Sequence, residues 1–177
     1  MLRRVRVVVV AEDQQQEMFL RQVLRGRRLD PRDMTFLVCA KGGFAADAWV
    51  LRTHGEEARI LLAVQHAQPR RGLITVIDAD ELTVERRHRQ LDEAAGAEPA
   101  RVSQARIAYV VPRRNIETWL IALAGRQADE VTDYKKRGAQ PEDCRAQAKA
   151  FNEQCAQDRA SLPAIAIACR ELDRVCT

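Results

Sequence analysis

The chain has 177 residues, of which 46% are hydrophobic, 31% charged and only 5% aromatic, with 8 glycines and 6 prolines. This length suits one domain with a core large enough to fold alone, and the composition excludes a collagen, a disulfide miniprotein and a disordered tail. The formal net charge of +4 permits a phosphate-bearing partner, but it is a weaker bias than an architectural DNA-binding protein would show.

The sequence carries no feature of a membrane or secreted protein. No apolar run approaches the roughly 18 residues that a membrane span needs. The first residues, 1–5, lack the apolar stretch and the small-residue cleavage site of a secretory signal. We therefore expect a cytoplasmic protein without membrane contact.

The cysteines and histidines form no motif for zinc binding or nucleophilic catalysis. No Cys-x-x-Cys pair occurs, and no histidine stands at zinc-ligand spacing from a cysteine. We expect free thiols in a reducing compartment at all five positions, which are Cys39, Cys144, Cys155, Cys169 and Cys176. The histidines fall in polar helical stretches and are expected on the surface, at His54, His66 and His88.

The first part of the chain alternates between short apolar runs and segments with helical spacing. Residues 6–11 form a β-branched run that predicts a strand buried on both faces. Residues 14–29 predict an amphipathic helix, and residues 34–39 predict a second strand. Two separate helical patterns follow, at 45–52 and 58–65.

The same alternation continues through the middle of the chain. Residues 73–77 predict a third buried strand, and residues 83–95 predict a polar helix. A fourth strand is predicted at 105–111, where Pro112 ends it, and an amphipathic helix at 116–124.

Strands that alternate with helices predict an α/β fold with a mostly parallel sheet flanked by helices. After residue 125 the sequence indicates only helices, at 141–157 and 162–175. We therefore divide the chain into an α/β core at 1–125 and a helical C-terminal extension at 126–177.

Acidic residues follow three of the four predicted strands. The first strand is followed by Glu12, the third by Asp78 and Asp80, and the fourth by Glu117 in the first turn of the next helix. Because ligands of a parallel sheet bind beyond the carboxyl ends of its strands, these acids are predicted to share one rim. Glu17, early in the first helix, is a further candidate for the same rim.

Clustered carboxylates repel one another, and a cation relieves that repulsion. Oxygen ligands select Mg²⁺, Mn²⁺ or Ca²⁺ over zinc. Strand alternation predicts that Asp78 and Asp80 point to the same side and reach one ion. An alternative stays open for each acid by itself, because Asp78 fits a helix cap and Glu117 fits the positive end of a helix.

Basic residues are predicted at the same edge of the sheet. Arg113 and Arg114 lie between the fourth strand and Glu117, and Lys41 follows the second strand. A metal site ringed by such cations suits a phosphodiester, whose charge must be held during reaction. Taken by themselves, the two arginines fit solvated loop charges better than phosphate ligands.

A glutamate after the first strand and an Asp-x-Asp after a later strand resemble the Toprim domain. That domain occurs in topoisomerases, bacterial primases, small RNA-maturation nucleases and overcoming-lysogenization-defect nucleases. The matching residues are Glu12 in VVVVAEDQQQE and Asp78 and Asp80 in LITVIDADE. The segment RRNIETWLIAL is similar to a stretch of small Toprim-like proteins from prokaryotic defence loci, and the resemblance covers roughly residues 5–124.

The resemblance implies an α/β nuclease that acts on nucleic acid, DNA rather than RNA, with an ATPase as its partner protein. It implies Mg²⁺ or Mn²⁺ held by Asp78 and Asp80, Glu12 as ligand or general acid/base, and Glu117 as a further ligand. A homo-oligomer is compatible with it. Many Toprim domains carry glycine directly after the first acid, where a tight turn follows, and this chain has Asp13 instead.

A regulatory or assembly subunit is the rival interpretation. Phospho-receiver domains also end buried strands in acids, with Asp78 as the phosphoacceptor, but they require a lysine where this chain offers Arg113. A non-catalytic Toprim-like subunit that docks a partner protein stays open. Cleavage that depends on Mg²⁺ or Mn²⁺ distinguishes the nuclease from both.

Overall fold

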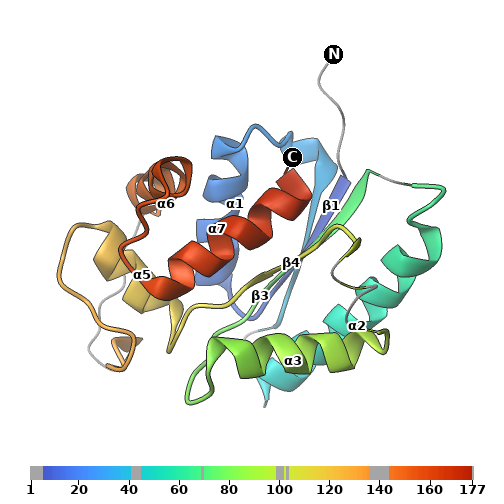
Figure 1. The fold of residues 1–177 in the computed structure, drawn as a ribbon, viewed down its shortest axis with the longest axis horizontal. Coiled ribbons are helices and arrows are strands. Elements are labelled where there is room, and N and C mark those ends of the chain that lie inside the picture. The colour runs from blue at the N-terminus through green and yellow to red at the C-terminus, as the bar shows by residue number, and fades with distance from the viewer. Residues whose placement is uncertain are drawn as a thin grey trace.

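A four-stranded parallel sheet forms the centre of the molecule (Figure 1). The structure, a computed structural model, describes residues 6–40, 45–68, 70–98, 102, 104–135 and 144–176. Within them the strands lie in the order β2-β1-β3-β4. Their bounds are Arg6–Ala11 for β1, Met34–Val38 for β2, Arg71–Val76 for β3 and Ile107–Val110 for β4. The predicted α/β class and all four predicted strands are confirmed.

Helices cover both faces of this sheet. In Figure 1, helices α2 (Ala46–Val64) and α3 (Val84–Ala95) pack against each other on one side. The other side carries α1 (Gln14–Gly26), α5 (Ile116–Leu123), α6 (Arg145–Gln157) and α7 (Pro163–Cys176). A short 3₁₀ turn at Pro31–Asp33 leads into β2.

The strand order creates a switch point between β1 and β3. From β1 the chain crosses to β2 on one side, and from β2 it returns past β1 to β3 on the other. β1 and β3 therefore lie side by side, with Ala11 paired to Val76 at their carboxyl ends. In open α/β sheets, ligands bind in the crevice beyond the carboxyl ends of the strands at such a point.

The two helices predicted at 45–52 and 58–65 are one continuous helix, so this prediction was wrong. Gly55 lies in the middle of α2. A Cβ atom at this position would lie 2.4 Å from the carbonyl oxygen of Ala94 in α3. The glycine therefore permits close packing of α2 on α3, and it does not interrupt the helix.

His54 is buried, contrary to the expectation that all three histidines lie on the surface. Its Nδ1 lies 2.8 Å from the hydroxyl oxygen of Thr75 on β3, and its ring packs edge-on against Tyr109. His88 also packs on Tyr109 and is half-buried, whereas His66 is exposed as expected. Burial lowers the pKa of His54 to about 4.

Because His54 is buried and its pKa is lowered, we expect the protein to lose stability in mild acid. Both the native and unfolded states hold a neutral histidine above pH 6.5, the unfolded pKa. Between pH 6.5 and 4 only the unfolded state takes up the proton, so the free energy of unfolding falls, by up to about 3 kcal/mol. Urea unfolding of the parent and of His54→Gln at each pH measures this difference.

His54→Gln is expected to show the shallower dependence over this range. The control, His66→Gln, removes an exposed imidazole and should follow the parent. Equal slopes for the parent and His54→Gln would contradict the assignment of this pH dependence to His54.

Helices α6 and α7 pack against the α/β core. Phe151 of α6 lies in an aromatic cluster with Phe19 of α1 and Trp119 of α5, at ring-centroid distances of 5.7 and 5.8 Å. On the outer edge of β4, the backbone N–H of Tyr109 donates to the carboxylate of Glu171 in α7 at 3.0 Å. The proposed domain boundary at residue 125 stays a prediction.

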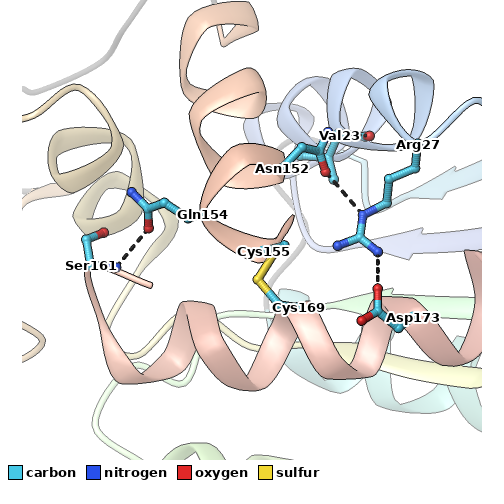
Figure 2. The surroundings of a disulfide bond; sticks show 8 residues. All are labelled: Val23, Arg27, Asn152, Gln154, Cys155, Ser161, Cys169 and Asp173. Atoms are coloured by element: carbon cyan, nitrogen blue, oxygen red, sulfur yellow. Dashed lines mark hydrogen bonds and ion pairs between the residues drawn. A yellow bond between two sulfur atoms is a disulfide. The ribbon is translucent and has the colours of Figure 1, made fainter. Parts of the chain in front are cut away.

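A disulfide between Cys155 and Cys169 joins α6 to α7 (Figure 2). The prediction of five free thiols was therefore wrong for this pair, whose sequence separation of 14 spans the turn between α6 and α7. Arg27 of α1 donates to Asn152 of α6 at 3.1 Å and to Asp173 of α7 at 2.6 Å. The guanidinium group of Arg27 thus connects α1 to both helices that the disulfide joins.

Reduction of this disulfide is expected to destabilise the fold. Opening a loop of this length increases the entropy of the unfolded chain, and the free energy of unfolding falls by about 3 kcal/mol as a result. Urea unfolding with and without dithiothreitol measures the effect, and a Cys155→Ser/Cys169→Ser double variant should no longer respond to the reductant. Cys39→Ser, which removes a free thiol, should respond like the parent.

None of the described helices combines the length and the hydropathy that a bilayer crossing requires.

Candidate functional site

Glu12 is held in place by the first turn of α1. The carboxylate of Asp13 caps this helix, accepting from the backbone N–H of Gln16 at 2.8 Å. The side-chain oxygen of the buried Gln16 accepts in return from the backbone N–H of Glu12 at 3.0 Å. Asp13 has extended backbone dihedrals, φ −146° and ψ 174°, so this loop does not need a glycine there.

The side chain of Glu12 reaches the neighbouring strand end. Its Oε2 accepts from the backbone N–H of Asp78 at 3.2 Å. The predicted convergence of Glu12 with the residues after β3 is therefore observed, and it follows directly from the pairing of β1 with β3.

The Asp78–Asp80 turn is tied to the loop after β4. The backbone N–H groups of Ala79 and Asp80 donate to the carbonyls of Pro112 and Arg114, both at 2.9 Å. Asp80 and Arg114 have left-handed φ angles of 53° and 74°. Aspartate adopts this conformation more readily than most residues, and the hydrogen bonds between the loops hold both residues in it.

Asp78 and Asp80 differ in exposure, because the strand geometry on which their common direction was predicted does not extend to them. β3 ends at Val76, and the left-handed backbone of Asp80 departs from strand geometry. Asp78 is only 3% exposed. The Asp80 side chain is 59% exposed and lies 3.7 Å from Arg87.

Glu117 is the second buried acid of the cluster beside Asp78, whereas Glu12 is half-buried. It lies in the first turn of α5, which Asn115 caps by accepting from the backbone N–H of Thr118 at 3.3 Å. Glu117 is 2% exposed. Two carboxylate oxygens, Oδ1 of Asp78 and Oε2 of Glu117, are buried without a hydrogen-bond partner among the residues that the structure describes. They are the two carboxylate oxygens among the buried side-chain atoms without a partner in the described part of the chain, and a buried carboxylate normally pairs with a donor, a water or an ion.

Burial and mutual repulsion raise the pKa values of the clustered carboxyl groups. Burial, and after it the charges of Glu12 and Glu117, raises the pKa of Asp78 well above its usual value. Burial also raises the pKa of Glu12 and of Glu117, although the hydrogen bond from Asp78 opposes the shift at Glu12. A group of acids that resists ionisation gains stability from any cation that binds near it.

Lys135 is a member of this site that the sequence did not indicate. Partial burial lowers its pKa, but the nearby carboxyl groups, of which Asp78 and Glu117 act most strongly, together raise the pKa overall. Lys135 follows the last predicted strand by more than twenty residues, in a segment without a motif. Only the path of the loop after α5 brings its ammonium group to the acids.

A cavity of about 510 Å³ opens beside the buried acids. Its lining includes Asp47, Asp80, Arg87, Arg114, Asn115 and Lys135. The exposed Asp80 and Lys135 therefore face this space, while Asp78 and Glu117 lie deeper. The cavity therefore leaves the exposed side of the cluster, at Asp80, open to a ligand.

The arginines predicted to hold phosphate bind loop backbone. Arg113 donates to the carbonyl of Leu82 and, at 3.4 Å, to that of Asp80. Arg114 donates to the same Asp80 carbonyl at 3.4 Å and lies 3.6 Å from the carboxylate of Asp133. Both side chains thus stabilise the turn, and of the two only Arg114 is among the cavity residues. Lys41 lies outside the described residues.

Glu17 does not join the acids around Asp78. It forms an ion pair with Arg21, one helical turn later, at 2.5 Å. Arg21 in turn lies over the ring of Phe36 on β2, with its Cζ 4.0 Å from the ring centroid. We therefore leave Glu17 out of the candidate site.

The acid cluster fits a hydrated Mg²⁺ or Mn²⁺ better than a cage built from protein ligands alone. Among the described residues, no three His, Cys, Asp or Glu side chains converge closely enough to hold an ion as they stand. Mg²⁺ usually binds through one or two carboxylates, several waters and substrate phosphate oxygens. The unpartnered oxygens of Asp78 and Glu117 supply that number of carboxylates.

Comparison of the chain with models of known protein families, with curated protein sequences and with solved structures finds no match. The case for a function therefore rests on the residues and their geometry.

Asp78→Asn is expected to stabilise the protein at pH 8 in the absence of divalent cations. The native-state pKa of Asp78 is raised, so its contribution to stability is present at low pH and is lost as pH rises through that pKa. The amide removes this loss, and we expect a gain of about 1 kcal/mol or more, roughly 2–4 °C in Tm. Thermal unfolding in EDTA measures it.

The control for this variant is Glu153→Gln, which changes an exposed acid that pairs with Lys149. That variant should change the Tm little, because exposed ion pairs contribute about 0–1 kcal/mol. A lower Tm for Asp78→Asn than for the parent at pH 8 would contradict the inference that the charge of Asp78 destabilises the native state.

Proposed function

We propose that this protein is a Toprim-like, metal-dependent nuclease that hydrolyses phosphodiester bonds of nucleic acid. The observation that carries the proposal is the pair of buried, unpartnered carboxylate oxygens on Asp78 and Glu117, beside Glu12 at the switch point of the sheet. The order of these acids along the chain supports the same family, because Glu12, the Asp78-x-Asp80 pair and the Ile116-Glu117-x-Trp119 segment follow one another as in the resemblance.

A bound Mg²⁺ or Mn²⁺ would supply the Lewis acidity for phosphodiester hydrolysis. Asp78 and Glu117 would contact the ion on its buried side, and Asp80 would contact it from the side of the cavity. The raised pKa of Glu12 suits a group that accepts a proton from water near neutral pH. Lys135 and Arg114 would face the phosphate in the cavity.

We propose DNA rather than RNA as the substrate and an ATPase as the partner protein, both on the strength of the family resemblance. The chain offers no sequence-reading module, so substrate choice would come from shape, ends or the partner. The net charge of +4 is consistent with a nucleic-acid ligand.

A non-catalytic, partner-docking subunit is the second candidate. The lack of a three-ligand cluster among the described acids favours it. A receiver-like role is less compatible with the site, although Lys135 supplies an ammonium group near Asp78. A phosphoacceptor must be accessible and ionised, whereas Asp78 is buried and its pKa is raised.

Cleavage assays with the whole chain test the proposal. Plasmid DNA, single-stranded DNA and RNA are incubated with Mg²⁺, Mn²⁺ or Ca²⁺, and EDTA should stop the reaction. Asp80→Asn removes the exposed carboxylate and should abolish cleavage while Tm stays near that of the parent, since this side chain is 59% exposed.

The matched control is Glu17→Gln, an acid at the start of the first helix that pairs with Arg21 instead of the cluster. It should cut like the parent. Cleavage by Asp80→Asn at the parent rate would eliminate the nuclease assignment. Absence of cleavage by the parent under every metal, together with co-purification of a partner protein, would favour the docking subunit.

A further inference from the structure

We propose that Arg87 is a positioning residue that holds the Asp78–Asp80 turn in the conformation that binds the cation. This inference rests on the proposed function, because it concerns the same site. Arg87 carries no local sequence signal, because it lies in a polar stretch that is typical of a solvated helix surface.

Arg87 is buried, although arginine rarely is. It lies in the first turn of α3 and is 2% exposed. The hydroxyl of Thr83 caps this helix by accepting from the backbone N–H of Arg86 at 3.1 Å, which fixes the start of the helix. A buried charge is tolerated only when it is paired and hydrogen-bonded, so the partners of Arg87 define its role.

Its guanidinium group spans both ends of the acidic turn. Nε donates to the carbonyl oxygen of Asp78 at 3.1 Å, and Nη2 lies 3.7 Å from the carboxylate of Asp80. Nη1 donates to the side-chain oxygen of Gln90 at 3.0 Å and lies 3.8 Å from Asp47. One rigid planar group therefore sets the backbone of one proposed ligand and the side chain of another.

The charge of Arg87 and its position act on cation binding in opposite directions. As a cation near the site, Arg87 repels a second cation and competes for Asp80, so its charge alone weakens metal binding. As a tether, it keeps the turn preorganised, and loss of such outer contacts typically lowers metal affinity 10–100-fold. Removal of Arg87 therefore distinguishes the two roles by the sign of the change.

Arg87→Met keeps the apolar stem and removes every donor. Mn²⁺ binding to the whole chain is followed by electron paramagnetic resonance of the free ion, alongside circular dichroism and Tm. We expect Arg87→Met to remain folded and to bind Mn²⁺ about 10–100-fold more weakly. Arg87→Lys, which restores the charge but reaches one acceptor, should recover only part of the affinity.

The control is Arg86→Met, which removes the same charge from the exposed neighbouring position. It should bind Mn²⁺ like the parent. Unchanged or tighter Mn²⁺ binding by folded Arg87→Met would overturn the positioning role and leave the proposed function intact. If Arg87→Met does not fold, Arg87→Lys decides, and parent-like affinity there overturns the role of the guanidinium fork.

Mn²⁺ binding by the parent protein distinguishes a failure of the role proposed for Arg87 from a failure of the proposed nuclease function. Mn²⁺ binding by the parent supports the metal site independently of Arg87. Absence of Mn²⁺ binding by the parent would overturn the proposed metal-dependent function, and the positioning role would fall with it.

Discussion

Repulsion among buried carboxyl groups is the constraint to which the rest of this structure responds. The pairing of β1 with β3 places the residues after Ala11 beside those after Val76, so Glu12 and Asp78 cannot separate without breaking the sheet. The first turn of α5 adds Glu117 to the same place. Each of these acids loses hydration and gains acidic neighbours at once, and both effects disfavour its charged form.

Several neighbouring groups reduce that cost without removing it. The backbone N–H of Asp78 donates to Glu12, and the ammonium group of Lys135 lies near the buried pair. Arg87 neutralises the exposed end of the turn at Asp80. Nevertheless, an oxygen of Asp78 and one of Glu117 keep no partner among the described residues. These neighbouring groups therefore offset the repulsion at the edges of the cluster, and the oxygens in its interior are left without a partner.

The sequence was most informative where one local pattern decides the structure. Four apolar runs predicted all four strands, and the acids after them predicted the meeting of Glu12 with Asp78. Gly55 misled, because a glycine in a helix marks either a break or a close approach, and only the position of Ala94 distinguishes them. Lys135, Arg87 and the Cys155–Cys169 pair lacked any local signal, since their roles depend on loops and helix packing.

The location of the strain argues for a binding role over a purely structural one. A buried aspartate with an unpartnered oxygen destabilises a fold, and an amide or apolar residue of similar size would relieve it. The surrounding structure is consistent with ordinary rules for stability: side-chain caps on α1, α3 and α5, a covered β4 edge and a packed aromatic cluster. Buried side-chain atoms without a partner also occur elsewhere among the described residues, but only those of Asp78 and Glu117 are carboxylate oxygens, so this rim is the place at which a ligand is expected to supply the missing interaction. The divalent cation that we propose would supply it, because it would both pair with the free oxygens and remove the repulsion between Asp78 and Glu117.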